Sequence, residues 1–379
     1  MRSTLRGTVV LVSLAVTAAA LAQPPGTAQP PNLAPPREAP KPKDISSGAI
    51  VGGKNLAEWI QDLKDKDPST RENALATLKL YGGVAREAAP LIINLLKDRD
   101  VSVRVNATIA LGLIGMDEKD QKDGIAGLIR LLGDGQLLIR YQAAMALGRL
   151  GTDAKEAIPA LIPLVRQDSY ASGGCWEVRK AAVYALSSVA AERNNPDSRA
   201  IVALIGAFND VSAQVRLEAV IGQILLGPGT TGKEKLMVER ALLPLTKDRS
   251  KHVQIWAHMA LMRMDKVSET HLVAIAKHLK APEATVHSHV GRALGTVGSE
   301  AKSRVPELID AIQSEDDPQA LLWLVWGLAR IQYGDPAPRA VDALKKLLEH
   351  KLEPIRMAAA EALEMLKGKM RDEKSLPSK

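Results

Sequence analysis

The sequence has very few aromatic residues and almost no cysteine. Only 3% of its 379 residues are aromatic, with a single Phe, and Cys175 is the one cysteine. One thiol cannot form a disulfide within the chain, and so few rings cannot fill an aromatic core. The hydrophobic fraction is still 46%, supplied mainly by Ala, Leu, Val and Ile. This composition excludes a disulfide framework, argues against disorder throughout, and favours a large helical protein.

Long apolar runs and charge of one sign are also missing. Beyond the N-terminal region no segment reaches about 18 uncharged apolar residues, so we expect no membrane span after signal cleavage. The net charge is +7, from 50 Lys and Arg against 43 Asp and Glu, and both signs are spread along the chain. A nucleic-acid binder usually carries a dense basic stripe. We therefore expect no nucleic-acid partner.

The N-terminal residues have the pattern of a secretory signal. Arg2 and Arg6 precede an apolar stretch that ends at the small-x-small sequence of residues 20–22. This pattern predicts cleavage after Ala22 and an exported, bacterial protein in the periplasm or outside the cell. An uncleaved anchor is the alternative. Residues 23–43 contain eight prolines in 21 positions, so residues 23–53 are predicted to be an extended linker.

The rest of the chain repeats itself. The segments VRVNATIALGLIG (103–115) and IRYQAAMALGRLG (139–151) share the frame apolar-Arg-x-x-Ala-x-x-Ala-Leu-Gly-x-apolar-Gly. With the Arg as an anchor, equivalent positions recur every 33 to 39 residues, which predicts nine units over residues 54–367 and a charged tail at 368–379. The anchor positions are Arg71, Arg104, Arg140, Arg179, Arg216, Gln254, His287, Leu321 and Arg356.

Each unit is predicted to contain two helices. In the second, apolar or small residues at −1, +3, +6, +7 and +10 from the anchor form a helical stripe. Asn55 with Glu58 predicts a capping box at the first helix, and Asp67-Pro68 predicts a capped helix start. Ala at +3 and +6 lets helices approach closely, which explains a core without aromatics. We predict an all-α fold, an α-solenoid of about nine stacked two-helix repeats.

This repeat resembles HEAT repeats, and its short period is similar to the HEAT-like class named after phycobilisome lyases. The Pro-x-Leu-x-x-Leu first helix and the Val-Arg-x-x-Ala-x-x-Ala-Leu-Gly second helix carry the resemblance. Members of this class serve as scaffolds, transport receptors, lyase subunits and, rarely, enzymes. The resemblance also implies that each anchor Arg pairs with an Asp of the same or the neighbouring unit. Asp67 with Arg71 and Asp100 with Arg104 have the i, i+4 spacing for such a pair.

The anchor pattern breaks in three consecutive units, at Gln254, His287 and Leu321. In these units the +2, +5 and +9 positions, which lie off the apolar stripe, are rich in Trp and Arg, the residue types that dominate binding hot spots. The resemblance implies that second helices line a concave surface, so these residues predict a partner-binding groove. The alternative is that the tryptophans pack between repeats. The candidate residues are Trp256, Met259, Arg263, His289, Arg292, Trp323, Trp326 and Arg330.

Motifs for catalysis are missing. The chain has no Gly-x-Ser-x-Gly, no phosphate-binding loop, no His-Glu-x-x-His and no His-Glu dipeptide of the kind carried by HEAT-like di-iron hydroxylases. Six of seven histidines fall within residues 252–289, but no pair there has the i, i+4 spacing of a helical metal site. We predict a monomeric, non-enzymatic scaffold of the cell envelope that binds a protein or peptide without metal or cofactor. The alternative is a metal-dependent enzyme, or an accessory subunit of one, that uses repeats 6–7.

Overall fold

The computed structural model describes residues 50–166, 176–191, 196–227, 232–264, 267–332, 334 and 337–367. The predicted signal segment, most of the Pro-rich linker, Cys175 and the charged tail lie outside these residues. The chain divides into two compact units at residues 241 and 242. We call the described residues 50–241 the N-terminal unit and the described residues 242–367 the C-terminal unit.

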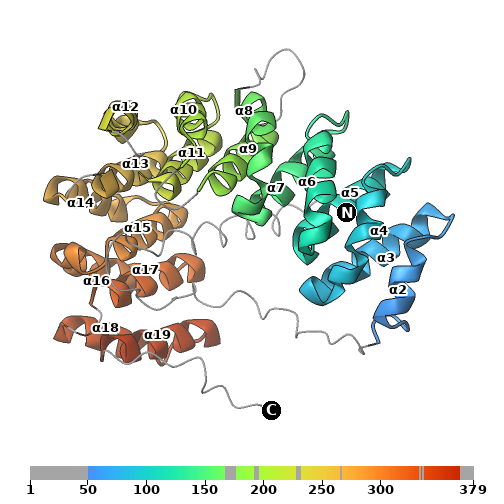
Figure 1. Ribbon diagram of the computed structural model, residues 1–379. Coiled ribbons are helices and arrows are strands. Elements are labelled where there is room, and N and C mark those ends of the chain that lie inside the picture. Colours follow the sequence, from blue (N-terminus) through green and yellow to red (C-terminus); the bar gives the residue numbers. More distant parts are fainter. Residues whose placement is uncertain are drawn as a thin grey trace. The chain divides into compact units, whose positions relative to one another are not determined.

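Helices make up nearly all of the N-terminal unit (Figure 1). They follow one another in pairs, and short 3₁₀ segments precede two of the first helices. In chain order the elements are α2 (Leu56–Asp62), α3 (Pro68–Tyr81), η1 (Gly82–Ala88), α4 (Ala89–Leu95), α5 (Val101–Ile114), α6 (Glu118–Leu131), α7 (Leu137–Leu150), η2 (Gly151–Ala157), α8 (Ile158–Arg166), α9 (Trp176–Val189), α10 (Ser198–Ala207), α11 (Ala213–Leu226) and α12 (Gly232–Leu242), which ends at the boundary.

The C-terminal unit continues the same alternation of a first and a second helix. None of the helices in the described part of the chain is long and apolar enough to cross a membrane. The elements of this unit are η3 (Leu243–Lys247), α13 (Lys251–Met264), α14 (Glu269–Ala276), η4 (Lys277–Lys280), α15 (Ala284–Val297), η5 (Gly298–Arg304), α16 (Val305–Ser314), α17 (Pro318–Ile331), α18 (Pro338–Leu347) and α19 (Glu353–Leu366).

The second helices confirm the predicted repeat and its register. All nine of them, α3, α5, α7, α9, α11, α13, α15, α17 and α19, contain 14 residues, and the anchor is the fourth residue of each. An unbroken register means that every repeat presents the same helix face to its neighbour. The protein is an all-α solenoid of two-helix repeats, as predicted.

The helix ends follow the predicted local chemistry. Asn55 and Glu58 form a capping box at α2, and Asp67 caps α3 ahead of a proline at its first position. Gly115 and Gly151 end α5 and α7 with φ of 76° and 61°. A side chain is strained in this left-handed region, so glycine is required there.

Small residues bring the second helices together. In α5 the whole predicted stripe is buried, and within each unit successive second helices pack on one another. At Gly112 a Cβ would lie 2.8 Å from Cβ of Ala146 on α7, closer than two such atoms can come. This spacing leaves no room for large rings between most repeats, so the Ala-rich frame accounts for the low aromatic content.

The anchor arginines form an ion-pair ladder between neighbouring repeats. Arg71 donates from Nε and Nη2 to the two oxygens of Asp98, at 2.8 and 2.9 Å. The guanidinium and the carboxylate belong to successive repeats, so this ion pair links one repeat to the next. The same connection joins Arg104 to Asp134 at 3.4 Å and Arg179 to Asp210 at 2.6 Å.

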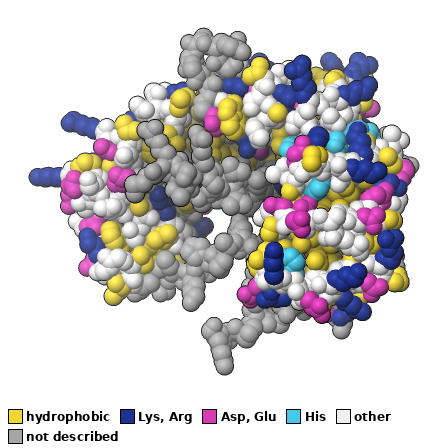
Figure 2. Space-filling model, turned by 180° about the vertical axis from the view of Figure 1, so that it is seen from behind, with side chains coloured by type: hydrophobic (Ala, Val, Ile, Leu, Met, Phe, Trp, Pro, Cys, Tyr) yellow, Lys and Arg dark blue, Asp and Glu magenta, His cyan; other side chains and the backbone are white. Residues whose placement is uncertain are grey.

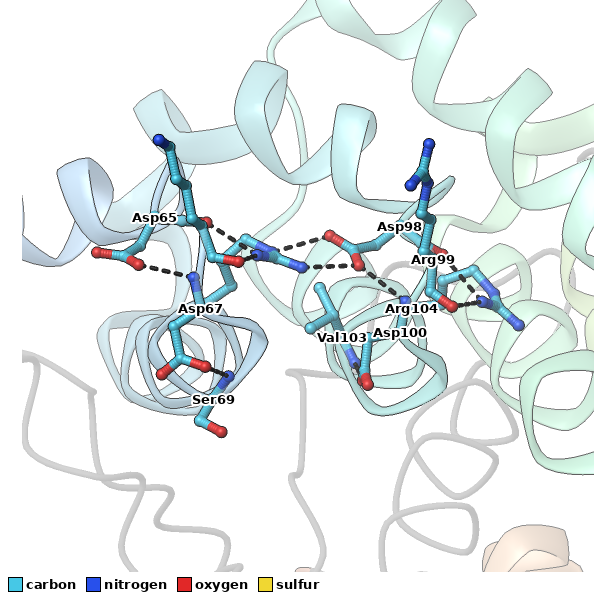
Figure 3. A network of polar contacts seen from close by, with 10 residues as sticks. Asp65, Asp67, Ser69, Asp98, Arg99, Asp100, Val103 and Arg104 are labelled. Carbon is cyan, nitrogen blue, oxygen red and sulfur yellow. Dashed lines mark hydrogen bonds and ion pairs between the residues drawn. The ribbon is translucent and has the colours of Figure 1, made fainter.

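The predicted i, i+4 pairs are wrong. Asp67 and Asp100 do not pair with Arg71 and Arg104, because their carboxylates accept backbone N–H groups of the first helical turn instead (Figure 3). Because these two aspartates cap their helices, Arg71 and Arg104 instead pair with a carboxylate of the following repeat. The resemblance also implied that an anchor could pair with the neighbouring repeat, and this prediction is confirmed.

Five of the anchor arginines also hold the turn before their own helix. In Arg104 the Nη1 atom donates to the carbonyl oxygens of Asp98 and Arg99, at 2.9 and 3.2 Å. These carbonyls lie in the turn between α4 and α5, so the guanidinium fixes that turn. The same pair of bonds is made by Arg71, Arg140, Arg216 and Arg356.

Two of the three departures from the anchor pattern preserve this bond. Gln254 donates from Nε2 to the carbonyl of Asp248 at 2.6 Å. His287 places Nε2 at 2.8 Å from the carbonyl of Ala281 and Nδ1 at 2.5 Å from Glu315 of the next repeat. A histidine therefore reaches both partners of an anchor arginine, whereas the buried Leu321 reaches neither.

An acidic residue six positions before the anchor completes this turn. Its carboxylate accepts the backbone N–H two residues later, at 2.8 to 2.9 Å. This column was missed in the sequence, although its spacing is regular enough to have been found. Its members are Asp65, Asp98, Asp134, Asp210, Asp248 and Glu315.

Candidate functional site

The +2, +5 and +9 positions of α13, α15 and α17 meet in the C-terminal unit. The guanidinium carbon of Arg292, on α15, lies 5.4 Å from the ring centroid of Trp256 on α13 and 4.8 Å from that of Trp323 on α17. Both distances are within the range of a cation–π contact. One arginine therefore bridges tryptophans of the two flanking repeats.

The contacts continue along α17. The rings of Trp323 and Trp326 meet edge to face, with centroids 5.7 Å apart, and the guanidinium of Arg330 lies 5.8 Å from the Trp326 ring. The resulting chain of alternating rings and cations crosses three repeats. We call Trp256, Arg292, Trp323, Trp326 and Arg330 the Trp–Arg ladder.

Two histidines, His289 and His252, lie at the Trp256 end of the ladder. Trp256 donates its Nε1–H to Nδ1 of His289 at 2.6 Å, so this nitrogen carries no proton. Burial, with Arg292 and His252 nearby, holds the pKa of His289 well below its ordinary value. The ring of His252 packs against His289 with centroids 4.5 Å apart. A neutral His289 is thus fixed by one hydrogen bond and one ring contact.

Burial separates the candidate residues into two groups. Trp256 and Met259 are fully buried, and Arg292 is 4% exposed. For Trp256 the packing interpretation therefore holds. Trp323, Trp326 and Arg330 are half-buried. These three residues on α17 form the outer part of the ladder, the part that another molecule can touch.

Arg263 and His289 are the remaining candidates beside Met259 and the ladder. Both side chains are half-buried, and burial lowers the pKa of the Arg263 guanidinium. The eight predicted residues therefore comprise a ladder, its histidine support, and Met259 and Arg263 beside it.

Two ladder donors lack acceptors among the described residues. The Nε1–H of Trp326 and the Nε–H of Arg330 are both enclosed without a hydrogen-bond partner. Burial lowers the pKa of Arg330, since no acidic group offsets the loss of solvent. Unsatisfied buried donors are costly.

Glycines explain why tryptophan fits on α17 when other repeats have small residues. Gly291 and Gly327 let the backbones of α15 and α17 touch, since a Cβ on Gly327 would lie 2.5 Å from the carbonyl oxygen of Gly291. A Cβ on Gly295 would lie 2.5 Å from the ring of Trp326. The ring therefore occupies space that a side chain on α15 would otherwise fill.

Two further histidines, His258 and His271, form a close pair. Nδ1 of His258 on α13 lies 2.8 Å from Nδ1 of His271 on α14. Desolvation, together with His271, Lys277 and His278, lowers the pKa of His258 to about 4. Two imidazoles can bind a metal ion, but no group of three or more candidate ligands occurs in the described part of the chain.

Comparison with known families identifies the repeat. The family described as HEAT repeats matches residues 56–122 and 305–378, and the family described as PBS lyase HEAT-like repeat matches residues 139–167. The matches fall in both units. A search of curated proteins gave no match.

Solved structures of similar arrangement include three with low sequence identity. An engineered protein is 21% identical over 85% of this chain and 92% of its own, with a TM-score of 0.45. The Escherichia coli protein YibA is 20% identical over 73% of this chain and 93% of its own, with a TM-score of 0.43. The complex of CpcE and CpcF of phycocyanin lyase from Nostoc sp. PCC7120 is 19% identical over 75% of this chain and 97% of its own, with a TM-score of 0.44.

Proposed function

Because the chain is a HEAT-like repeat protein, we propose that it is a non-enzymatic, monomeric scaffold of the cell envelope that holds a partner protein or peptide. Helical-repeat arrays offer extended surfaces for such partners. The observation that carries the proposal is the outer part of the Trp–Arg ladder. There Trp323, Trp326 and Arg330 stand half-buried on one helix and contact one another in sequence.

The chemistry of these residues defines what they bind. Two tryptophan rings present apolar surface with few rotatable bonds, and Arg330 offers charged donors beside them. The matching feature is an apolar side chain followed by a carboxylate or carbonyl group. On the face shown in Figure 2, side chains of both charge signs are interspersed, which supports a protein partner over a nucleic acid.

Capture from the native envelope tests the ladder. We expect W323A and R330Q to lose one set of partners that the wild-type chain retains, measured by crosslinking and quantitative mass spectrometry. W176A is the matched control, because Trp176 is 40% exposed on α9 of the other unit. If all three variants capture the same proteins as wild type, the ladder is not the binding site.

Stability measurements on the same variants separate binding from packing. R330Q keeps a polar side chain at a half-buried position, so we expect its thermal midpoint to stay close to that of wild type. If R330Q loses partners only because the C-terminal unit unfolds, the ladder has a packing role and the proposal is wrong.

Export is the second part of the proposal, and it rests on the N-terminal sequence. We expect the protein isolated from its native envelope to begin at Gln23. N-terminal sequencing of the mature chain measures this directly. A chain that retains Met1 and stays in the cytoplasm would contradict a role in the envelope.

The alternative function, a metal-dependent enzyme or accessory subunit, would use the His258–His271 pair. Two imidazole nitrogens 2.8 Å apart could bind one ion after a small rotation of either ring. Metal analysis of the purified native protein distinguishes the two functions. Stoichiometric zinc or iron that is lost in H258Q would favour the enzyme or accessory subunit over the scaffold.

A further inference from the structure

A cavity of about 270 Å³ lies within the N-terminal unit, away from the Trp–Arg ladder residues in the sequence. The C-terminal ends of α5 and α7, the start of α6 and the segments η1 and η2 enclose it. Its lining includes two arginines, Arg86 and Arg149, together with Gln121 and Asp153. The cavity therefore gathers two guanidinium groups from different repeats.

Arg149 is the inner cation of this cavity. Its Nη1 atom is enclosed and has no hydrogen-bond partner among the described residues. Burial lowers the pKa of its guanidinium, and the titratable groups that act on it are the phenols of Tyr141 and Tyr184. Burial raises the pKa of both phenols, so they carry no charge near neutral pH. Arg149 is half-buried as a whole, and no carboxylate offsets the burial of its guanidinium.

Arg86 is the outer cation. Its side chain is exposed, and it takes part in no ion pair of the described residues. Both guanidinium groups lie beside glycines at the end of α5. Arg149 Nη1 lies 3.5 Å from where a Cβ of Gly112 would be, and Arg86 Nε lies 3.5 Å from where a Cβ of Gly115 would be. The two cations thus border the same end of α5.

Negative groups near the cavity do not replace an anion. Asp153 lines it but is exposed, and it forms no ion pair with Arg86 or Arg149 in the described residues. The ends of α5 and α7 carry partial negative charge that attracts cations. Nevertheless Arg149 Nη1 donates to no carbonyl there, so one charged donor stays unsatisfied. An enclosed donor without an acceptor is costly until one binds it.

We propose that this cavity is a binding site for a small oxyanion of the phosphate or carboxylate class. Arg149 donates to two oxygens of the anion, since the planar guanidinium matches such groups. Arg86 closes the site from its outer side, and the side-chain amide of Gln121 supplies a further donor. The cavity is smaller than a typical drug-sized ligand site, so the ligand is a small anion or the terminal anionic group of a larger molecule.

Titration of the intact chain with inorganic phosphate at constant ionic strength tests the site. We expect a saturable rise in the thermal midpoint and a binding isotherm by calorimetry. Parallel titrations with succinate and with a peptide that has a free or an amidated C-terminus distinguish the phosphate and carboxylate sources. No saturable response to any of these anions would overturn the proposal.

Arginine variants locate the effect. We expect R149M and R86M each to weaken anion binding at least tenfold. R99M is the matched control, because Arg99 is exposed on a turn of the same unit, and it should bind as wild type does. Equal weakening in R99M would show general screening and overturn the site.

The stability of R149M without an anion separates a ligand site from a structural role. Removal of an unpaired buried cation should leave the thermal midpoint unchanged or raise it. If R149M is instead less stable and still responds to phosphate as wild type does, Arg149 only supports the helix ends and the proposal is wrong. R86M then provides the same test at an exposed position where folding is not at risk. This result is independent of the Trp–Arg ladder.

Discussion

At the scale of single residues, burial decides what an ion pair contributes. Arg179 meets Asp210 at 2.6 Å and Arg199 meets Asp197 at 2.7 Å, so the two contacts are almost equally short. The side chains of the first pair are 6% and 9% exposed, whereas Arg199 is 62% exposed. In the first pair the loss of one partner leaves a buried charge, whereas in the second the cation is largely solvated and Asp197 is 23% exposed, so the pair contributes little.

We therefore predict that R179M lowers the free energy of unfolding by about 3–5 kcal/mol, the range for breaking a buried pair from one side. R199M is the control, and we expect no measurable change. Urea denaturation of both variants gives the comparison. A small effect of R179M, similar to that of R199M, would show that the Arg–Asp ion pairs between repeats do not stabilise the N-terminal unit.

The repeat frame predicted the positions of the anchor residues, but it did not predict their ion-pair partners. Local spacing suggested Asp67 for Arg71, because i, i+4 residues face each other on a helix. The structure gives that aspartate to the helix cap and pairs Arg71 with Asp98. The choice depends on the position of the next repeat, which local spacing does not contain. The acidic residue six positions before six of the nine anchors was the missed signal.

At the scale of secondary-structure elements, the closest contact is between α15 and α17. It depends on Gly291 and Gly327, where backbone meets backbone. A methyl group at Gly327 would lie 2.5 Å from a carbonyl oxygen, and backbone cannot move aside as a flexible side chain can. The helices would have to separate, which would also shift Trp323 and Trp326.

We predict that G327A lowers the free energy of unfolding by about 1–3 kcal/mol, because overpacking exceeds the gain in helix propensity. G206A on α10 is the matched control, since a Cβ there meets nothing within 4 Å. It should be neutral or stabilising by up to about 1 kcal/mol. Thermal and urea unfolding measure both, and equal effects would contradict the close-contact explanation.

The site shows where sequence reasoning about elements ends. Helical spacing correctly grouped Trp256, Arg292 and Trp323, because the register of the 14-residue helices never slips. It did not distinguish Trp256, which is fully buried, from Trp323, which is half-buried. That difference arises from the opposing residue of the next repeat. His289 accepts a hydrogen bond from Trp256 and covers it.

At the scale of the whole molecule, histidine is confined to one unit. All seven histidines lie between residues 252 and 350, within the C-terminal unit. Burial lowers the pKa of His278 from 6.5 to about 4, with Lys277, Lys251 and His252 adding to the effect, and His258 has the same value. Burial also lowers the pKa of His252 and His271. Titration between pH 6.5 and 4 therefore acts on this unit far more than on the other.

The sign of the pH effect follows from these shifts. Below pH 6.5 the unfolded chain binds protons that the folded C-terminal unit still excludes, so stability is lost as pH falls toward about 4. We predict a loss on the order of 1 kcal/mol for each of His258 and His278, reduced by nearby solvent. In the N-terminal unit Asp98 has a pKa below 3.8, so its pairing persists through this range.

Amide hydrogen exchange at pH 7 and pH 5, corrected for the intrinsic rates, resolves the two units. Protection should fall on α13, α14 and α15 while it persists on α5 and α7. The double variant H258Q and H278Q should lose part of this pH dependence, because glutamine does not titrate, and the remainder comes from His252, His271 and His289. H350Q is the control, since His350 lies in the same unit but outside this histidine cluster, and it should behave as wild type does. An equal loss of protection in both units would mean that groups other than these histidines set the acid sensitivity.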